Sequence, residues 1–155
     1  MAFSAAPREA LDRLDDELRR APALGSALFS KVIAHACRRI PILAQTGKVA
    51  HLDRLIAAGA WTDAASGLVA LELPAWSLRR FVHEDGEWLC SLSREPSLPL
   101  ALDDTADARH HSLPLAILLA LLEARRMAEI GPAVVSATPY VQPASDRIIC
   151  CDNFA

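Results

Sequence analysis

The stretch LPLAILLALL, at residues 113–122, decides the fold of this chain. It continues in helical spacing through charged residues that include Glu123, Arg125 and Arg126. A surface helix carries its apolar residues along one stripe, so a helix that is apolar on every side must be covered all round. The run is about half of the roughly 20 residues that a membrane-spanning helix needs. It therefore predicts a helix in the domain core or at an oligomer interface, and not a membrane span.

The length of the chain favours a place at an oligomer interface, rather than in the domain core, for this helix. At 155 residues it fits one domain, which has limited room to surround such a helix. We therefore expect part of the helix to meet a second chain, most simply in a two-fold dimer. The alternative is that the other helices and a β-hairpin cover the helix completely. The candidate interface residues are Leu115, Leu118, Leu121 and Leu122.

The composition excludes several classes of protein. Hydrophobic residues make up 52% of the chain, while Lys+Arg 16 against Asp+Glu 19 gives a net charge of -3. No overall basic field draws the chain to nucleic acid or to a membrane, so neither is an expected partner. The N-terminus lacks the basic and then apolar order of a secretory signal, and the 4 cysteines are too few and too irregularly placed for a disulfide framework. We expect a cytoplasmic protein with reduced thiols.

The spacing of apolar residues predicts that the chain is mostly helical. The expected helices span Pro7–Arg20, Ser26–Ile40, the segment between Gly47 and Gly59, and Thr62–Leu73. A last helix is expected to open at Asp103, Asp104 or Thr105, to bend or restart at Ser112-Leu113-Pro114, and to end at Gly131-Pro132. Pro41 is expected to stop or kink the second of these helices. Ankyrin-like residues around Gly47 and Gly59 lack a second copy, so a repeat protein is not predicted.

Between these helices the pattern changes to a period of two. Trp76–His83 and Glu87–Ser93 read as strands joined at Asp85-Gly86, a dipeptide that tolerates the positive φ angles of a tight hairpin turn. This turn predicts the pairs His83 with Trp88, Phe81 with Cys90, and Arg79 with Leu92. A longer loop is the alternative, because the same register sets Glu84 opposite Glu87. The face expected to pack on helices carries Phe81, Trp88, Cys90 and Leu92.

An isolated hairpin needs further packing, and the apolar helix is its natural cover. The sequence thus predicts an α+β fold, mostly helical, with a β-hairpin or small antiparallel sheet packed on a C-terminal apolar helix. Residues 1–130 are expected to form this single domain. Residues 131–155 are expected to be an irregular tail, in which Ala133–Val135 and Arg147–Cys150 could add edge strands.

Histidine and cysteine are the residues most able to support chemistry. His110 and His111 are adjacent, so they diverge on a helix, and a metal site with Cys150 and Cys151 would need the tail to fold back. We interpret the two histidines as surface residues beside a helix bend. Cys37 points away from its neighbour His35 on a helix and reads as a buried thiol, as does Cys90.

Other signals of chemistry have simpler interpretations. Asp15-Asp16 and Asp103-Asp104 read as a solvated helix face and an N-terminal cap. No phosphate-binding loop, nucleophile elbow or zinc-binding helix motif occurs. We therefore predict no catalytic residue, no metal ligand and no cofactor, and we leave the enzymatic question open with a leaning against activity.

The helices at 26–40 and 48–58 also resemble a helix-turn-helix. Their connection, however, is long and apolar, and the second helix offers few polar residues that could read bases. A DNA-binding regulator is therefore the third hypothesis, after an interaction module and a small enzyme or metal protein that uses His and Cys. The basic residues of this region are Lys31, Arg38, Arg39, Lys48 and Arg54.

Three stretches resemble a small bacterial family of uncharacterised proteins. They are Leu73–Arg80, Glu84–Trp88 and Ala108–His110, and the likeness runs from about Phe29 to Arg126. The resemblance implies a bacterial cytoplasmic protein and brings no assigned activity or site residues. The function that we predict is a non-enzymatic interaction or regulatory module, working as a homo-oligomer and with an unknown protein as a further partner.

Overall fold

The structure is a computed structural model, and it describes residues 5–130. The predicted tail at 131–155, with its two proposed edge strands, lies outside the described residues. In chain order the elements are α1 (Ala5–Arg20), α2 (Ser26–Ala36), α3 (Ile40–Leu43), the 3-10 turn η1 (Ala44–Thr46), α4 (Ala50–Ala57), α5 (Trp61–Glu72), β1 (Ser77–Glu84), β2 (Glu87–Ser93), the 3-10 turn η2 (Leu100–Leu102), β3 (Ala106–His110) and α6 (Leu113–Ile130).

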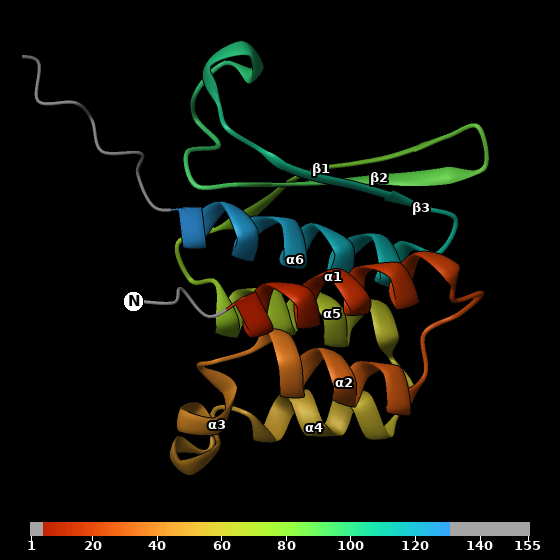
Figure 1. Ribbon diagram of the computed structural model, residues 1–155, viewed down its shortest axis with the longest axis vertical. Coiled ribbons are helices and arrows are strands. Elements are labelled where there is room, and N and C mark those ends of the chain that lie inside the picture. Colours follow the sequence, from red (N-terminus) through yellow and green to blue (C-terminus); the bar gives the residue numbers. More distant parts are fainter. Residues whose placement is uncertain (1–4, 131–155) are drawn as a thin grey trace, which may run out of the picture.

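The elements are stacked in layers (Figure 1). A three-stranded antiparallel sheet, in the order β1-β2-β3, lies on one side of α6, while α1 and α5 pack on its other side. The helices α2 and α4 lie farther from the sheet, against α1 and α5 respectively. The predicted α+β fold, with a small antiparallel sheet on the C-terminal apolar helix, is confirmed.

The apolar helix is covered within one chain. Every side chain of α6 from Leu115 to Leu122 is at most 1% exposed. The four candidate interface residues Leu115, Leu118, Leu121 and Leu122 are each 0% exposed, so they offer no surface to a second chain. Sheet and helices sandwich α6 from two sides, which explains an apolar stretch without a single polar stripe.

The hairpin turn is as predicted. Asp85 has a φ of 53° and Gly86 a φ of 80°, the two positive angles that a tight two-residue hairpin turn requires. His83 pairs with Trp88 and Phe81 with Cys90. The pairing of Arg79 with Leu92 was wrong, because a β-bulge between Leu78 and Arg80 gives Leu92 the partner Leu78 instead.

The packed face of the hairpin is covered only in part. Cys90 and Leu92 are fully buried, as predicted, but Trp88 is half-buried and Phe81 is 44% exposed. Phe81 and Trp88 are incompletely covered because α6 packs chiefly under β2 and β3, while β1 lies at the edge of the sheet.

A third strand occupies the place where the last helix was expected to open. β3 pairs antiparallel with β2, and its side chains alternate between buried and exposed in the sequence ADARH. Alanine favours helices in isolation, and a segment of 5 residues is too short for its alternation to stand out. The edge of β2 is available for pairing, and hydrogen bonding to it stabilises a strand at β3 more than the weak local preference of the alanines stabilises a helix.

The helices of the first half largely follow their predicted ranges. α2 ends at Ala36 rather than at Ile40, and a separate short helix, α3, then begins at Ile40. Pro41 lies in the first turn of α3, where its missing N–H costs nothing. The prediction that Pro41 stops or kinks the second helix was wrong, because α2 already ends at Ala36 and the proline starts α3 instead.

Candidate interaction surface

The two cysteines of the described chain are buried thiols. Burial raises the pKa of Cys37 to about 12, and the nearby Glu72 carboxylate adds to the rise. Burial also raises the pKa of Cys90 to about 12, with a smaller contribution from Asp107. Both thiols are therefore protonated at neutral pH, whereas a reactive cysteine needs its thiolate. The interpretation of these residues as buried thiols is confirmed.

The histidine pair is divided between the core and the surface. His111 is exposed, but His110 is only 4% exposed, so the interpretation of both as surface residues was wrong for His110. The Nδ1 atom of His110 accepts the backbone N–H of Ser112 at 2.9 Å, at the start of α6. Its Nε2 atom makes no hydrogen bond within residues 5–130. Here His110 caps the turn between β3 and α6.

Burial is the main cause that lowers the pKa of His110, and the neighbouring His111 lowers it further. The Arg19 carbonyl opposes this shift, although its geometry falls short of a hydrogen bond. Within the described part of the chain, no cluster of three His, Cys, Asp or Glu residues could hold a metal ion. Cys150 and Cys151, the other partners of the metal hypothesis, lie outside that part.

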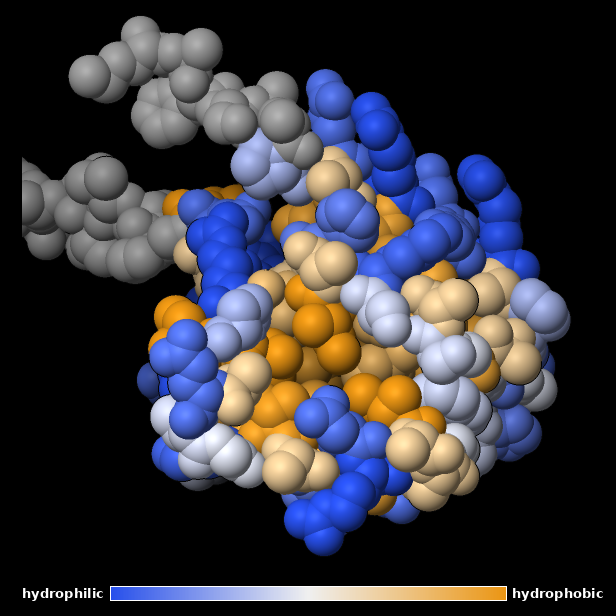
Figure 2. Space-filling model, turned by 90° about the horizontal axis from the view of Figure 1, so that it is seen from below, coloured by the Kyte–Doolittle hydropathy of each residue, from blue (hydrophilic) through white to orange (hydrophobic). Residues whose placement is uncertain are grey.

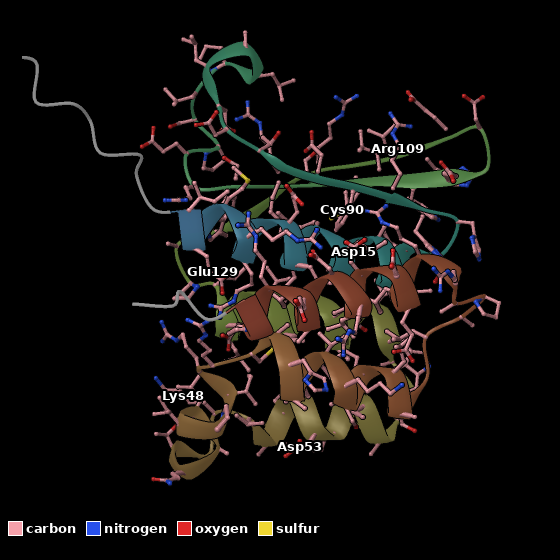
Figure 3. The ribbon with its side chains drawn as sticks, viewed as in Figure 1. Asp15, Lys48, Asp53, Cys90, Arg109 and Glu129 are labelled. Carbon is pink, nitrogen blue, oxygen red and sulfur yellow. The ribbon has the colours of Figure 1, made fainter. Side chains whose placement is uncertain are left out.

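Asp15 does not lie on a solvated face. Asp15 is 7% exposed and joins α1 to α6, since its carboxylate lies 2.6 Å from Arg19 Nε and 3.3 Å from Arg126 Nη1 (Figure 3). Asp16 does face solvent, as predicted. Helical spacing separates the two, because Asp15 lies four residues after Leu11 and three before Leu18 on the buried face of α1. The ion partner of Asp15 could not be predicted, because Arg126 lies 111 residues away.

Asp103 is a structural anchor rather than a helix cap. Its carboxylate accepts hydrogen bonds from the Arg79 guanidinium and from the Ser93 hydroxyl, the latter at 2.7 Å. Arg79 also donates to the carbonyl of Leu98. These bonds hold the segment between β2 and β3 against the bulge of β1, and so fix the shape of the sheet at that end.

Glu72 is the buried acid that sequence analysis missed. Its side chain, at the end of α5, is 0% exposed. One carboxylate oxygen accepts the backbone N–H of Arg38 at 2.6 Å, and the other accepts those of Arg39 at 2.9 Å and Ile40 at 3.3 Å. A guanidinium nitrogen of Arg125 lies 3.8 Å away. Glu72 therefore ties the turn between α2 and α3 to the core.

The helix α3 that follows this turn lies with α2 and α4 on the side of the molecule opposite the sheet. Figure 2 shows apolar atoms gathered in the middle of this side, over the helices farthest from the sheet, with charged side chains around them. We call this region the underside surface. Half-buried or exposed apolar residues of α2, α3 and α4, the helices on this side, include Ile33, Ile42, Leu43, Leu55 and Ile56.

The underside surface does not resemble a DNA-binding face. In a helix-turn-helix the second helix carries polar side chains that read bases, yet α4 carries the half-buried Leu55 and Ile56 here. Two of the basic residues are engaged in ion pairs, Lys31 with Glu17 and Arg38 with Glu129. The apolar centre interrupts the continuous basic face that the DNA hypothesis requires.

Ile42 is the most prominent residue of this surface, at 69% exposed. Its signal in the sequence was the apolar connection Ile42-Leu43-Ala44, which argues against a helix-turn-helix but does not by itself indicate a surface. Glu72, which holds the backbone of Arg39 and Ile40, fixes the place of this connection. The surface is thus supported by a buried charge as well as by packing.

Comparison with known proteins finds no matching family model, no similar curated protein and no matching solved structure. Among the helices at residues 5–130, none has the length and apolar character that crossing a bilayer requires.

Proposed function

We propose that this chain is a non-enzymatic interaction or regulatory module that acts as a homo-oligomer. The observation that carries the interaction role is the underside surface, where Ile42 is 69% exposed and Leu55 and Ile56 of α4 are half-buried. Contiguous apolar surface with a polar rim is typical of sites that bind another protein. We assign this surface to a protein partner.

The construction of the underside surface supports a binding role. Glu72 accepts three backbone N–H groups of the turn that leads into Ile42, so the turn is ordered before any partner arrives. A preformed surface loses little conformational entropy on binding. Covering one fully exposed isoleucine side chain contributes about 1.5–3 kcal/mol. Association also has an entropic cost, so we expect Ile42 and the half-buried residues around it to contribute together.

The roles of the cysteines and of His110 favour this function over a small enzyme. Cys37 and Cys90, with pKa values of about 12, are thiols at neutral pH and lack the reactivity of a nucleophile. His110 uses its Nδ1 atom to cap α6. We further propose that the protein works in the bacterial cytoplasm, where these buried thiols stay reduced.

Site-specific photo-crosslinking tests the underside surface. A photo-reactive amino acid is placed at Ile42, and the matched control is Leu102, which is 71% exposed on η2 at the other side of the molecule (Figure 1). Both positions are equally apolar and accessible. In cells that produce the protein, we expect a discrete adduct with one protein from position 42 and none from position 102.

Equal labelling at the two positions would show that exposure alone causes the adducts, and no adduct at position 42 would remove the assigned binding role. Oligomeric state is tested separately by light scattering at micromolar concentration. A dimer or larger assembly is expected, and a monomer would refute the homo-oligomer.

A further inference from the structure

The second accessible surface of the molecule is the outer edge of β1. Among residues 5–130 this strand pairs with β2 on one side only, and it has 8 residues against 5 in β3 at the opposite edge. An edge strand presents backbone N–H and C=O groups that can pair with another strand. Within the described part of the chain, β1 is therefore the longer of the two unpaired edges of the sheet.

Only part of this edge is regular. The β-bulge between Leu78 and Arg80 interrupts it at one end, where Arg79 is held by Asp103, and the turn at Asp85 ends it at the other. The regular part is Arg80–Glu84, and its midpoint is Val82.

The side chains of this regular part are complementary to themselves. When two copies of Arg80–Glu84 pair antiparallel about their midpoint, Arg80 of each lies opposite Glu84 of the other. Both of these side chains are exposed in the single chain. Opposite charges that face each other across a strand pair stabilise it, so the pairing places two attractive pairs at its ends.

The apolar side chains of β1 fit the same arrangement. Phe81 lies on the face of the sheet that packs on α6, yet 44% of its surface is exposed because α6 lies under β2 and β3. In the paired arrangement Phe81 of each chain faces His83 of the other, and the two Phe81 rings come together next to the two-fold axis. His83 already contacts Trp88, with ring centroids 4.8 Å apart.

We propose that two chains form a two-fold dimer by antiparallel pairing of their β1 edges at Arg80–Glu84, centred on Val82, so that the two sheets join into one. The proposal rests on the homo-oligomer of the proposed function and identifies its interface, Arg80–Glu84 of the two chains, which we call the seam. It leaves the underside surface of each chain free for a different protein.

Charge reversal tests the seam. Light scattering across a concentration series is expected to show a wild-type dimer, and Arg80→Glu or Glu84→Arg alone should weaken dimerisation by about tenfold or more, since each creates two like-charge pairs. An equimolar mixture of the two variants should restore the dimer as a heterodimer. Arg109→Glu, an exposed change on β3, is the matched control and should leave the dimer unchanged (Figure 3).

A disulfide test fixes the register. In a Cys150→Ser/Cys151→Ser chain, Val82→Cys should form an intermolecular disulfide on mild oxidation, because residue 82 lies opposite itself. Arg80→Cys should not, since its two copies would lie roughly 13 Å apart along the strands, well beyond disulfide reach. Circular dichroism checks that every variant is folded.

The outcomes separate the two proposals. A wild-type monomer refutes the homo-oligomer and the β1 seam together. A wild-type dimer that is insensitive to both charge reversals, or that cross-links equally at positions 80 and 82, refutes the seam and leaves the homo-oligomer standing.

Discussion

Replacement of Glu72 by glutamine should destabilise the domain far more than the loss of one surface charge. In the best orientation of the amide, its oxygen keeps the N–H groups of Arg39 and Ile40. Its NH₂ group then faces the backbone N–H of Arg38, which is 2.6 Å from the carboxylate in the native protein. Two donors cannot bond to each other, so a buried backbone N–H loses its partner.

The magnitude follows from these contacts. A hydrogen bond to a charged group contributes about 1.5–3 kcal/mol, and a buried donor left without a partner adds a desolvation penalty of similar size. Arg125, whose guanidinium lies 3.8 Å from Glu72, also loses its counter-charge. We expect Glu72→Gln to lower the free energy of unfolding by about 3 kcal/mol.

Urea denaturation measures this change, with Glu17→Gln as the control. Glu17 pairs with Lys31, but both side chains are about half exposed, so its replacement should cost at most about 1 kcal/mol. If the two variants unfold at the same urea concentration, the role of Glu72 as the anchor of the turn between α2 and α3 is wrong.

Three further predictions concern the turn, the buried histidine and the thiols. Gly86→Val should destabilise the domain by about 1–3 kcal/mol in urea, because the φ of 80° at this position is strained for a β-branched residue. Since the fold lowers the pKa of His110, protonation favours the unfolded chain, so the free energy of unfolding should be highest above the ordinary pKa of 6.5 and should fall as the pH drops below it. His110→Gln should flatten that slope, and an unchanged slope would mean that other groups cause it. In a Cys150→Ser/Cys151→Ser chain, Cys37 and Cys90 should react with a thiol reagent only after unfolding, and rapid reaction of the native protein would contradict their burial.

Local chemistry explains why the hairpin could be predicted from the sequence. Asp85-Gly86 supplies the turn, and the alternation on both sides supplies the register near it. The bulge at Arg79 could not be predicted, because it depends on Asp103, which is 24 residues away. β3 was missed for the same reason, since its alternating alanines acquire a strand conformation only beside β2.

The candidate site was harder to predict than the fold. The sequence of α6 shows that the helix must be covered but does not show by what, and a sheet of three strands with two helices proved sufficient. Ile42 and Phe81 are exposed because neighbouring elements do not extend over them, which is a property of the assembled layers. Glu72 lies among apolar residues in the sequence, and its three hydrogen-bond donors are backbone N–H groups, which leave no pattern of residue types.

The central place of α6 also determines when the chain can fold during synthesis. Sheet and helices both rest on a segment that begins at Leu113, and Arg126 closes ion pairs with Asp12 and Asp15, which lie more than a hundred positions earlier. Until α6 has left the ribosome, the strands and helices that pack on its two sides therefore expose their apolar faces. Premature termination upstream of Leu113 should therefore yield an aggregating fragment rather than a smaller domain, because its apolar surface stays exposed.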